Sequence, residues 1–218
     1  MATARHLAAD GSFFVNIKAH AEDGQRHLYV FDLVVAHARR WSWLFKDDLV
    51  WFKRSMPGEW PDRFRNDWEP VFHFAPSKAI KFRPMNVVHE SDACRSYAPN
   101  GGRTFGGNIG IGDIGHVSGL ARPGNVIEIS TRENPDGNAH SAAFPPRLPE
   151  FFIKAFSDAG DLVVDPFLGS GSTLIAAAKT GRVARGFEIS PRYCDVIRRR
   201  WTKYARSAGI DPGAGALD

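Results

Sequence analysis

The segment that most constrains the fold is residues 162–173, Leu-Val-Val-Asp-Pro-Phe-Leu-Gly-Ser-Gly-Ser-Thr. It predicts an apolar strand that enters a glycine-rich turn and then the N-terminus of a helix, where small residues let a ligand approach the backbone closely. Glu188 follows nineteen residues after Gly169, at the end of the next expected strand. A carboxylate at that position can accept hydrogen bonds from both hydroxyls of a ribose. The pattern predicts a site for an adenosine group on an α/β sheet, rather than a turn that binds nothing.

The rest of the chain supplies further strands and helices for such a sheet. After the midpoint, strands and helices alternate, which is typical of a parallel sheet. The expected strands are residues 12–17, 48–53, 68–74, 125–130, 161–165 and 183–189. The expected helices are residues 27–45, 148–157, 173–180 and 191–206. The two aromatic strands 48–53 and 68–74 are expected to pair as a hairpin at a sheet edge.

A long glycine-rich insert interrupts these elements. Nine glycines lie between residues 101 and 124, with few large apolar residues among them. Such a composition cannot build a core element, so we expect an irregular functional loop there. The tail from residue 207 is also rich in glycine and is expected to fray.

Composition excludes several classes of protein. The chain has 218 residues, a net charge of +4 and two cysteines, Cys94 and Cys194. Two distant cysteines predict neither a disulfide scaffold nor a structural zinc site, which suits a reducing, cytoplasmic setting. The group His89, Glu90, Asp92 and Cys94 matches no common ligand spacing, so no metal site is predicted. No run is long and apolar enough for a signal peptide or a membrane span.

The glycine turn also discriminates among ligands. A P-loop would need Gly-Lys-Ser/Thr, which this turn lacks. A dinucleotide fold prefers a third glycine after Gly169-Ser-Gly171, and the chain has Ser172-Thr-Leu instead. A pyrophosphate is therefore disfavoured, and a ligand carrying a positive charge is preferred. The glycine run at 107–112 follows no predicted strand and is expected to be loop.

Several motifs together resemble the beta group of DNA amino methyltransferases. Residues 165–173, Asp-Pro-Phe-Leu-Gly-Ser-Gly-Ser-Thr, are similar to the group's S-adenosylmethionine motif. Residues 140–146, His-Ser-Ala-Ala-Phe-Pro-Pro, look like the motif that precedes it, and 186–190, Gly-Phe-Glu-Ile-Ser, match its acidic ribose-binding strand. The likeness extends over roughly residues 10–205, since the strands at 12–17, 49–53 and 64–74 resemble the group's later catalytic-half strands.

This resemblance implies a class I methyltransferase fold, Rossmann-like α/β with permuted motif order, and S-adenosylmethionine as the cofactor. It divides the chain into catalytic-half strands and a helix (1–77), a target recognition insert (78–133), a cofactor-binding half (134–206) and a flexible tail (207–218). The cofactor contacts it implies are His140, Ser141, Phe144, Asp165, Phe167, Gly169, Gly171, Ser172 and Glu188.

The group's catalytic tetrapeptide, Asp/Asn/Ser-Pro-Pro-aromatic, is absent from these 218 residues. No catalytic residue is therefore assigned to this chain. In the group, the strand that ends in the tetrapeptide lies between the cofactor strand and the strand corresponding to 12–17. We therefore expect a sheet that lacks a strand at its N-terminal side. The missing strand is supplied by a second copy of the chain (a homodimer) or by a complementing N-terminal fragment, or else the chain is a truncated copy.

The implied substrate is an exocyclic amine of adenine or cytosine in double-stranded DNA, a base that must be flipped out for methylation. Basic residues in the insert and at one strand end are the expected DNA contacts: Lys53, Lys81, Arg83, Arg95, Arg103 and Arg122. The basic C-terminal helix has two interpretations, a phosphate contact or a solvated face. Two alternatives to a methyltransferase remain: a non-catalytic subunit or remnant that binds DNA or cofactor, and, less favoured, a nicotinamide-dependent oxidoreductase.

Overall fold

The computed structural model of the chain describes residues 6–53, 61–90, 120–131 and 144–213. Within these ranges the strands form two main sheets and two short pairs. The larger sheet has the order β1 (Phe13–Asn16), β5 (Trp68–Ala75), β4 (Leu44–Phe52) and β8 (Val126–Glu128). The smaller joins β10 (Val183–Gly186) to β9 (Leu162–Asp165). The short pairs are β2 (Ala21–Glu22) with β3 (Gln25–Arg26), and β6 (His89–Glu90) with β7 (Leu120–Ala121).

The helices flank these sheets. Those of α type are α1 (Tyr29–Val35), α2 (Arg147–Phe156), α3 (Ser172–Lys179) and α4 (Pro191–Ser207). A π-helical turn, η2 (Ala36–Arg40), continues α1, and η3 (Pro84–Val87) is a short 3-10 helix. Among the described residues, no helix combines the length and the apolar character needed to cross a membrane.

The helix expected over residues 27–45 is shorter than the sequence pattern indicates. Helical structure ends at Arg40, and Ser42 adopts a left-handed φ of 57°. Strand β4 then begins at Leu44, which pairs with Ala75. Pairing with β5 therefore overrides the helical periodicity at this end, as tertiary contacts commonly do.

The two aromatic strands do pair antiparallel, but their predicted place at a sheet edge is wrong. β1 pairs antiparallel with the outer side of β5, and β8 pairs parallel with the outer side of β4. Both aromatic strands thus lie inside the sheet, which explains why the last five residues of β5 are all buried.

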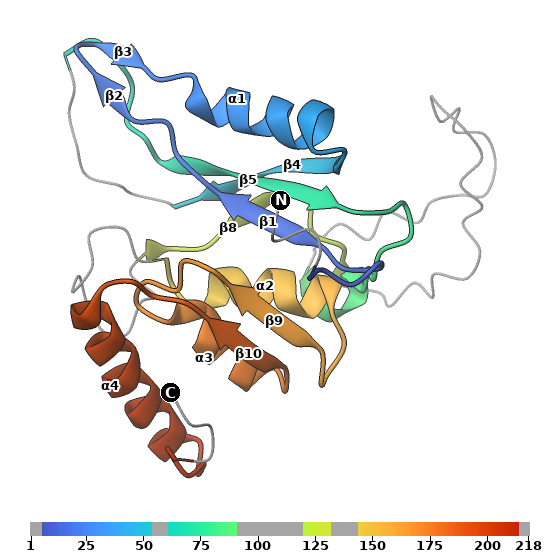
Figure 1. Cartoon of the computed structure of the whole chain (residues 1–218), viewed down its shortest axis with the longest axis vertical. Helices are drawn as coiled ribbons and strands as arrows, with labels where there is room; N and C mark the ends of the chain where they lie inside the picture. Colours follow the sequence, from blue (N-terminus) through green and yellow to red (C-terminus); the bar gives the residue numbers. More distant parts are fainter. Residues whose placement is uncertain (1–5, 54–60, 91–119, 132–143, 214–218) are drawn as a thin grey trace.

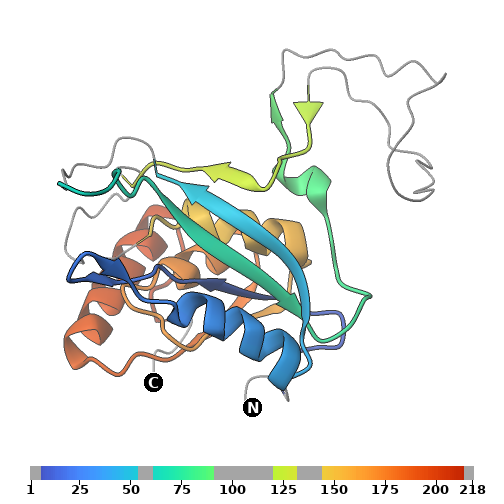
Figure 2. The ribbon, with the colours of Figure 1, turned by 90° about the horizontal axis from the view of Figure 1, so that it is seen from above.

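Helices cover both faces of this four-stranded sheet, with α1 above it and α2 below it in Figure 1. On the α1 side, Val30 packs with Trp43, Phe72 and Phe74. On the α2 side, the buried cluster is formed by Leu49, Trp51, Val71, Ile127, Ile129, Leu148 and Phe152. Figure 2, viewed from above, shows α1 lying over this sheet. This sheet therefore has a buried apolar cluster on each of its two faces.

The β9–α3–β10–α4 succession agrees with the predicted βαβα order, and β9 and β10 pair parallel. Strand β10 ends at Gly186, whereas the sequence pattern predicted a strand that extends to residue 189. One face of the pair packs on helices, where Val163 and Ala184 contact a cluster of Ile153, Ala176 and Ala177. On the other side, Leu162 and Val164 are 58% and 52% exposed. β9 and β1 belong to separate sheets, at the place where the family resemblance inserts another strand.

Candidate functional site

The glycine-rich turn between β9 and α3 is held in shape by Asp165, the last residue of β9. One carboxylate oxygen accepts the Phe167 amide at 3.0 Å, and the other accepts the Thr173 hydroxyl at 2.6 Å. The carboxylate therefore ties both ends of the turn together. A charged acceptor makes such bonds stronger than a neutral one would, so the turn is preorganised.

Glu188 closes the turn from the neighbouring chain segment, just after β10. Its two oxygens accept the backbone amides of Gly169 and Ser190, each at 2.8 Å. A carboxylate has about four lone-pair positions, so two remain for other donors. Glu188 thus lies against the turn, as the sequence spacing of nineteen residues predicts, with acceptor capacity left for a ligand's hydroxyls.

The glycines are required by backbone geometry and by close packing. Gly169 and Gly171 have φ of 56° and 84°, a region that other residues adopt only with strain. A Cβ at Gly171 would lie 3.2 Å from Ile197 of α4, whereas the nearest atom to one at Gly169 is 3.8 Å away. Helix α4 therefore packs against one side of the turn, and the space above Gly169 stays open.

Two buried polar residues support the turn from below. Ser172 donates to the Phe144 carbonyl at 2.8 Å. Arg200 of α4 donates to the Ser170 carbonyl at 2.6 Å and to its hydroxyl at 2.7 Å. Ser172, predicted as a cofactor contact, thus directs its hydroxyl into the protein. Arg200 was grouped in the sequence with the other charges of the C-terminal helix, and only the fold reveals that it lies beneath the turn.

Exposed apolar side chains surround the turn. Phe167 is 88% exposed, Phe187 is 67% exposed and Ile189 is 98% exposed. Large apolar side chains near a polar turn suit the flat face of a purine. The predicted contacts Phe144, Asp165, Phe167, Gly169, Gly171, Ser172 and Glu188 are thus gathered at one place, while His140 and Ser141 lie outside the described residues.

The charge around the turn favours a cationic ligand over a phosphate. Two carboxylates, Asp165 and Glu188, flank it, and the guanidinium of Arg200 is committed beneath it. A pyrophosphate at this place would meet these negative groups without a lysine of the P-loop type. The residues present therefore fit an adenosine that carries a positively charged substituent.

Lys53, predicted as a DNA contact, is buried at the end of β4. Its ammonium pairs with Glu69 and lies 4.7 Å from the centre of the Trp51 ring. Burial, and then the charge of Lys53, lowers the pKa of nearby Lys18. Lys53 therefore has an internal partner, a role that a sequence pattern alone does not reveal.

Lys81 and Arg83 connect the chain after β5 to the loop that precedes β9. Lys81 contacts Asp161 at 2.6 Å, and Arg83 contacts Asp158 at 3.1 Å. The hydrogen bond with Asp161 raises the pKa of Lys81, while a bond from the Asp158 amide, followed by Lys81, lowers the pKa of Asp161. Of the remaining predicted DNA contacts, Arg122 is exposed, and Arg95 and Arg103 lie outside the described residues.

Comparison with known proteins assigns the chain to a family. The DNA methylase family of N6 and N4 amino methyltransferases matches residues 2–199, and the chain belongs to this family. The type II methyltransferase M.PvuII of Proteus hauseri is 28% identical over 220 residues, covering 87% of this chain and 64% of that protein. The type II methyltransferase M.ScaI of Streptomyces caespitosus is 41% identical over 82 residues, covering 38% of this chain and 27% of that one.

Solved structures agree on the fold. The PvuII DNA methyltransferase, described as cytosine-N4-specific, superposes with a TM-score of 0.69 at 25% identity, over 91% of this chain and 66% of that one. M1.HpyAVI, solved with SAM, gives a TM-score of 0.59 at 20% identity, over 90% of this chain and 78% of its own. The class I methyltransferase fold expected from the sequence is confirmed. The chain spans just under two thirds of the length of M.PvuII.

Proposed function

We propose that this chain belongs to a site-specific DNA methyltransferase that moves a methyl group from S-adenosylmethionine to an exocyclic amine of a DNA base. The observation that carries the proposal is Glu188, whose carboxylate bridges Gly169 and Ser190 at the glycine turn of a DNA methylase family member. Likeness to the cytosine-N4-specific PvuII enzyme favours cytosine over adenine as the target.

The turn has the features that this cofactor requires. The free lone pairs of Glu188 suit the two ribose hydroxyls, and Phe167 and Ile189 suit the two sides of the adenine. The open space over Gly169 lets the cofactor approach the backbone. His140, Ser141 and Phe144 are proposed to enclose the methionine end. When bound, S-adenosylmethionine supplies an electrophilic methyl group, and the residues of this chain bind and orient it.

Transfer also needs groups that polarise the target amine, and this chain lacks the family's tetrapeptide. We propose that a complementing segment supplies it as a strand placed beside β9. Two observations support that place: within the described residues, the edge of β9 away from β10 has no partner strand, and Leu162 and Val164 are exposed on a sheet face that the rest of such a segment would cover. Alternatively, a second copy of the chain covers β9. Sedimentation analysis would distinguish the two cases, because the second one gives the mass of a dimer.

Contacts to double-stranded DNA are proposed for three basic residues of the insert. Lys53, Lys81 and Arg83 have acidic partners within the protein, which favours structural roles for them. Arg95, Arg103 and Arg122 then remain as the proposed contacts. Reversing the charges of Arg95 and Arg103 is expected to reduce the dependence of DNA affinity on salt, because fewer counterions are released. An unaltered salt slope would place the contact elsewhere.

Calorimetry of S-adenosylmethionine binding tests the cofactor assignment. Glu188→Ala is expected to weaken binding by about 1–3 kcal/mol, because it removes a charged acceptor of hydrogen bonds. Glu22→Ala is the matched control, since it removes an exposed carboxylate on β2. Equal affinity in the two variants would contradict the ribose assignment.

A methyl-transfer assay distinguishes two hypotheses: an active methyltransferase, and a non-catalytic subunit or remnant. The missing tetrapeptide favours the second hypothesis. The chain alone, with labelled S-adenosylmethionine and duplex DNA, is expected to bind cofactor without transferring methyl above background. Transfer by the chain alone would show that catalytic groups are present in it. Transfer that begins only after a tetrapeptide-bearing segment is added would support complementation.

We also propose a cytoplasmic location, because a reducing setting suits the free thiol of Cys194.

A further inference from the structure

Helix α4 has a larger net positive charge than the whole chain. Its seventeen residues contain six basic side chains and one acidic one, a balance of +5, whereas the whole chain has +4. The rest of the molecule is therefore nearly neutral in sum. A strong local field at α4 follows from this distribution.

Four of the six basic side chains lie on the exposed side of the helix. Ile197, Arg200 and Ala205 are buried and anchor α4 to the glycine turn and α3. At about 100° per residue, Arg192, Arg199, Lys203 and Arg206 lie opposite that buried stripe. All four are exposed. We call these four residues the basic face of α4.

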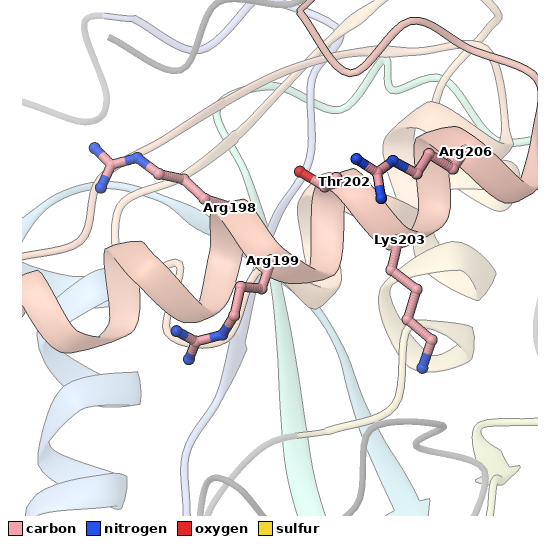
Figure 3. Close-up of a pocket in the computed structure, with 5 residues that line it drawn as sticks. All are labelled: Arg198, Arg199, Thr202, Lys203 and Arg206. Atoms are coloured by element: carbon pink, nitrogen blue, oxygen red, sulfur yellow. The ribbon is translucent and has the colours of Figure 1, made fainter.

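Three members of the basic face, Arg199, Lys203 and Arg206, border an open depression in the protein surface. Arg198, Arg199, Thr202, Lys203 and Arg206 line it (Figure 3), and its volume is about 510 Å³. In Figure 3, Arg199 and Lys203 extend to one side of the helix and Arg198 to the other. Arg198 is paired with Asp195 at 3.2 Å, the single carboxylate of the helix. Like charges four residues apart, such as Arg199 and Lys203, disfavour a helix, so this arrangement is not explained by helix stability.

The spacing of the basic face matches a regular polyanion. Residues 192, 199 and 206 are separated by seven positions each, so they recur about every 10.5 Å along the helix axis. A DNA strand presents one phosphate about every 3.4 Å along the duplex axis, so this spacing corresponds to about every third phosphate. Arginine binds phosphate through two parallel hydrogen bonds. The anchored inner side of α4 fixes the direction of these cations.

We propose that the basic face of α4 binds the sugar–phosphate backbone of double-stranded DNA, independently of base sequence. This surface lies outside the cofactor turn and outside the insert, and the proposal rests on the proposed function as a DNA methyltransferase. Its contribution is affinity rather than recognition, because phosphate contacts position a protein on the duplex without reading bases.

The test is fluorescence anisotropy with a labelled 30-base-pair duplex, titrated at several salt concentrations. The variant Arg199→Glu/Arg206→Glu is compared with Arg39→Glu/Arg40→Glu, an equal change of charge at the exposed end of η2. Two lost phosphate contacts are expected to reduce the slope of log K against log salt by about 2, and to weaken binding about tenfold at low salt. The η2 variant is expected to retain the unmodified slope.

Each other outcome overturns the proposal in a distinguishable way. Equal slopes in both variants would remove α4 from the DNA contact while leaving the methyltransferase function intact. Failure of the unmodified chain to bind duplex DNA would overturn both proposals for DNA. An unchanged slope combined with loss of a dimer in the α4 variant would make an acidic protein surface the partner instead. S-adenosylmethionine affinity, measured on each variant, verifies that the turn beside α4 is intact.

Discussion

The four-stranded half and the β9–β10 half of this molecule differ in how their sheets are covered. The four-stranded sheet has helices on both faces, and Phe74 at its centre has no exposed surface. The β9–β10 pair has helices on one face, while Leu162 and Val164 remain about half exposed. Apolar residues at a sheet face gain little stability until something covers them.

We infer from this contrast that stability and ligand binding depend on different halves. The covered half contains the two larger clusters of buried apolar residues. The half with the open face supplies the glycine turn, Asp165 and Glu188. This division predicts that the largest losses of stability come from substitutions in the first half, and that substitutions at the turn of the second half also weaken ligand binding.

The largest effect is expected in the covered half. Phe74→Ala should lower the free energy of unfolding by about 3–5 kcal/mol, because it leaves a cavity in a fully buried site. Urea denaturation followed by tryptophan fluorescence measures this change. Leu162→Ala on the open face is the control, with a loss of less than about 1 kcal/mol. Equal losses in the two variants would break the contrast between the halves.

The next effect concerns the support of the glycine turn. Arg200→Ala should destabilise the protein by about 1–3 kcal/mol, because it leaves the Ser170 carbonyl and hydroxyl without a buried donor. It should also weaken S-adenosylmethionine binding, since the turn loses its shape. Arg200→Lys should restore part of both losses. A thermal shift without any change in cofactor affinity would mean that the turn is held by Asp165 and Glu188 alone.

A smaller, pH-dependent effect is expected from His73 in the covered half. Burial, and then the charge of Lys46, lowers the pKa of His73 to about 4; its ring stacks on Phe14 at 4.4 Å. Between pH 6.5 and 4 the unfolded chain binds a proton that the folded chain does not, so stability should fall as the pH decreases through this range. His73→Phe should remove this pH dependence of the free energy of unfolding, as measured by urea denaturation at several pH values. An unchanged pH dependence in the variant would contradict the role of His73.

The smallest effect is expected on the open face of β9. Leu162→Thr/Val164→Thr should change the stability of the isolated chain by less than about 0.5 kcal/mol, because both side chains are already half exposed. The same variant should bind less of a hydrophobic dye than the unmodified chain. If a complementing segment covers this face, association with that segment should be weakened, and unchanged association would move the covering elsewhere.

The sequence was sufficient to predict the β9–α3–β10 unit and its glycine turn because their determinants are local. Glycines at 169 and 171 satisfy left-handed φ values, and the spacing to Glu188 follows from one strand–helix–strand unit. The order β1-β5-β4-β8 depends instead on pairings between distant segments, so the aromatic strands were placed at an edge incorrectly. The internal partners of Lys53 and the burial of Arg200 likewise depend on segments that no local pattern joins.

The tight contact between Gly171 and Ile197 has a mechanical consequence. A methyl group at Gly171 would come within 3.2 Å of Ile197, and Arg200 bonds the neighbouring Ser170. The turn and α4 are therefore packed as one unit. If a polyanion held on the outer side of α4 displaces this unit, it changes the affinity of the turn for the cofactor, and by thermodynamic reciprocity the cofactor changes the affinity for the polyanion by the same factor.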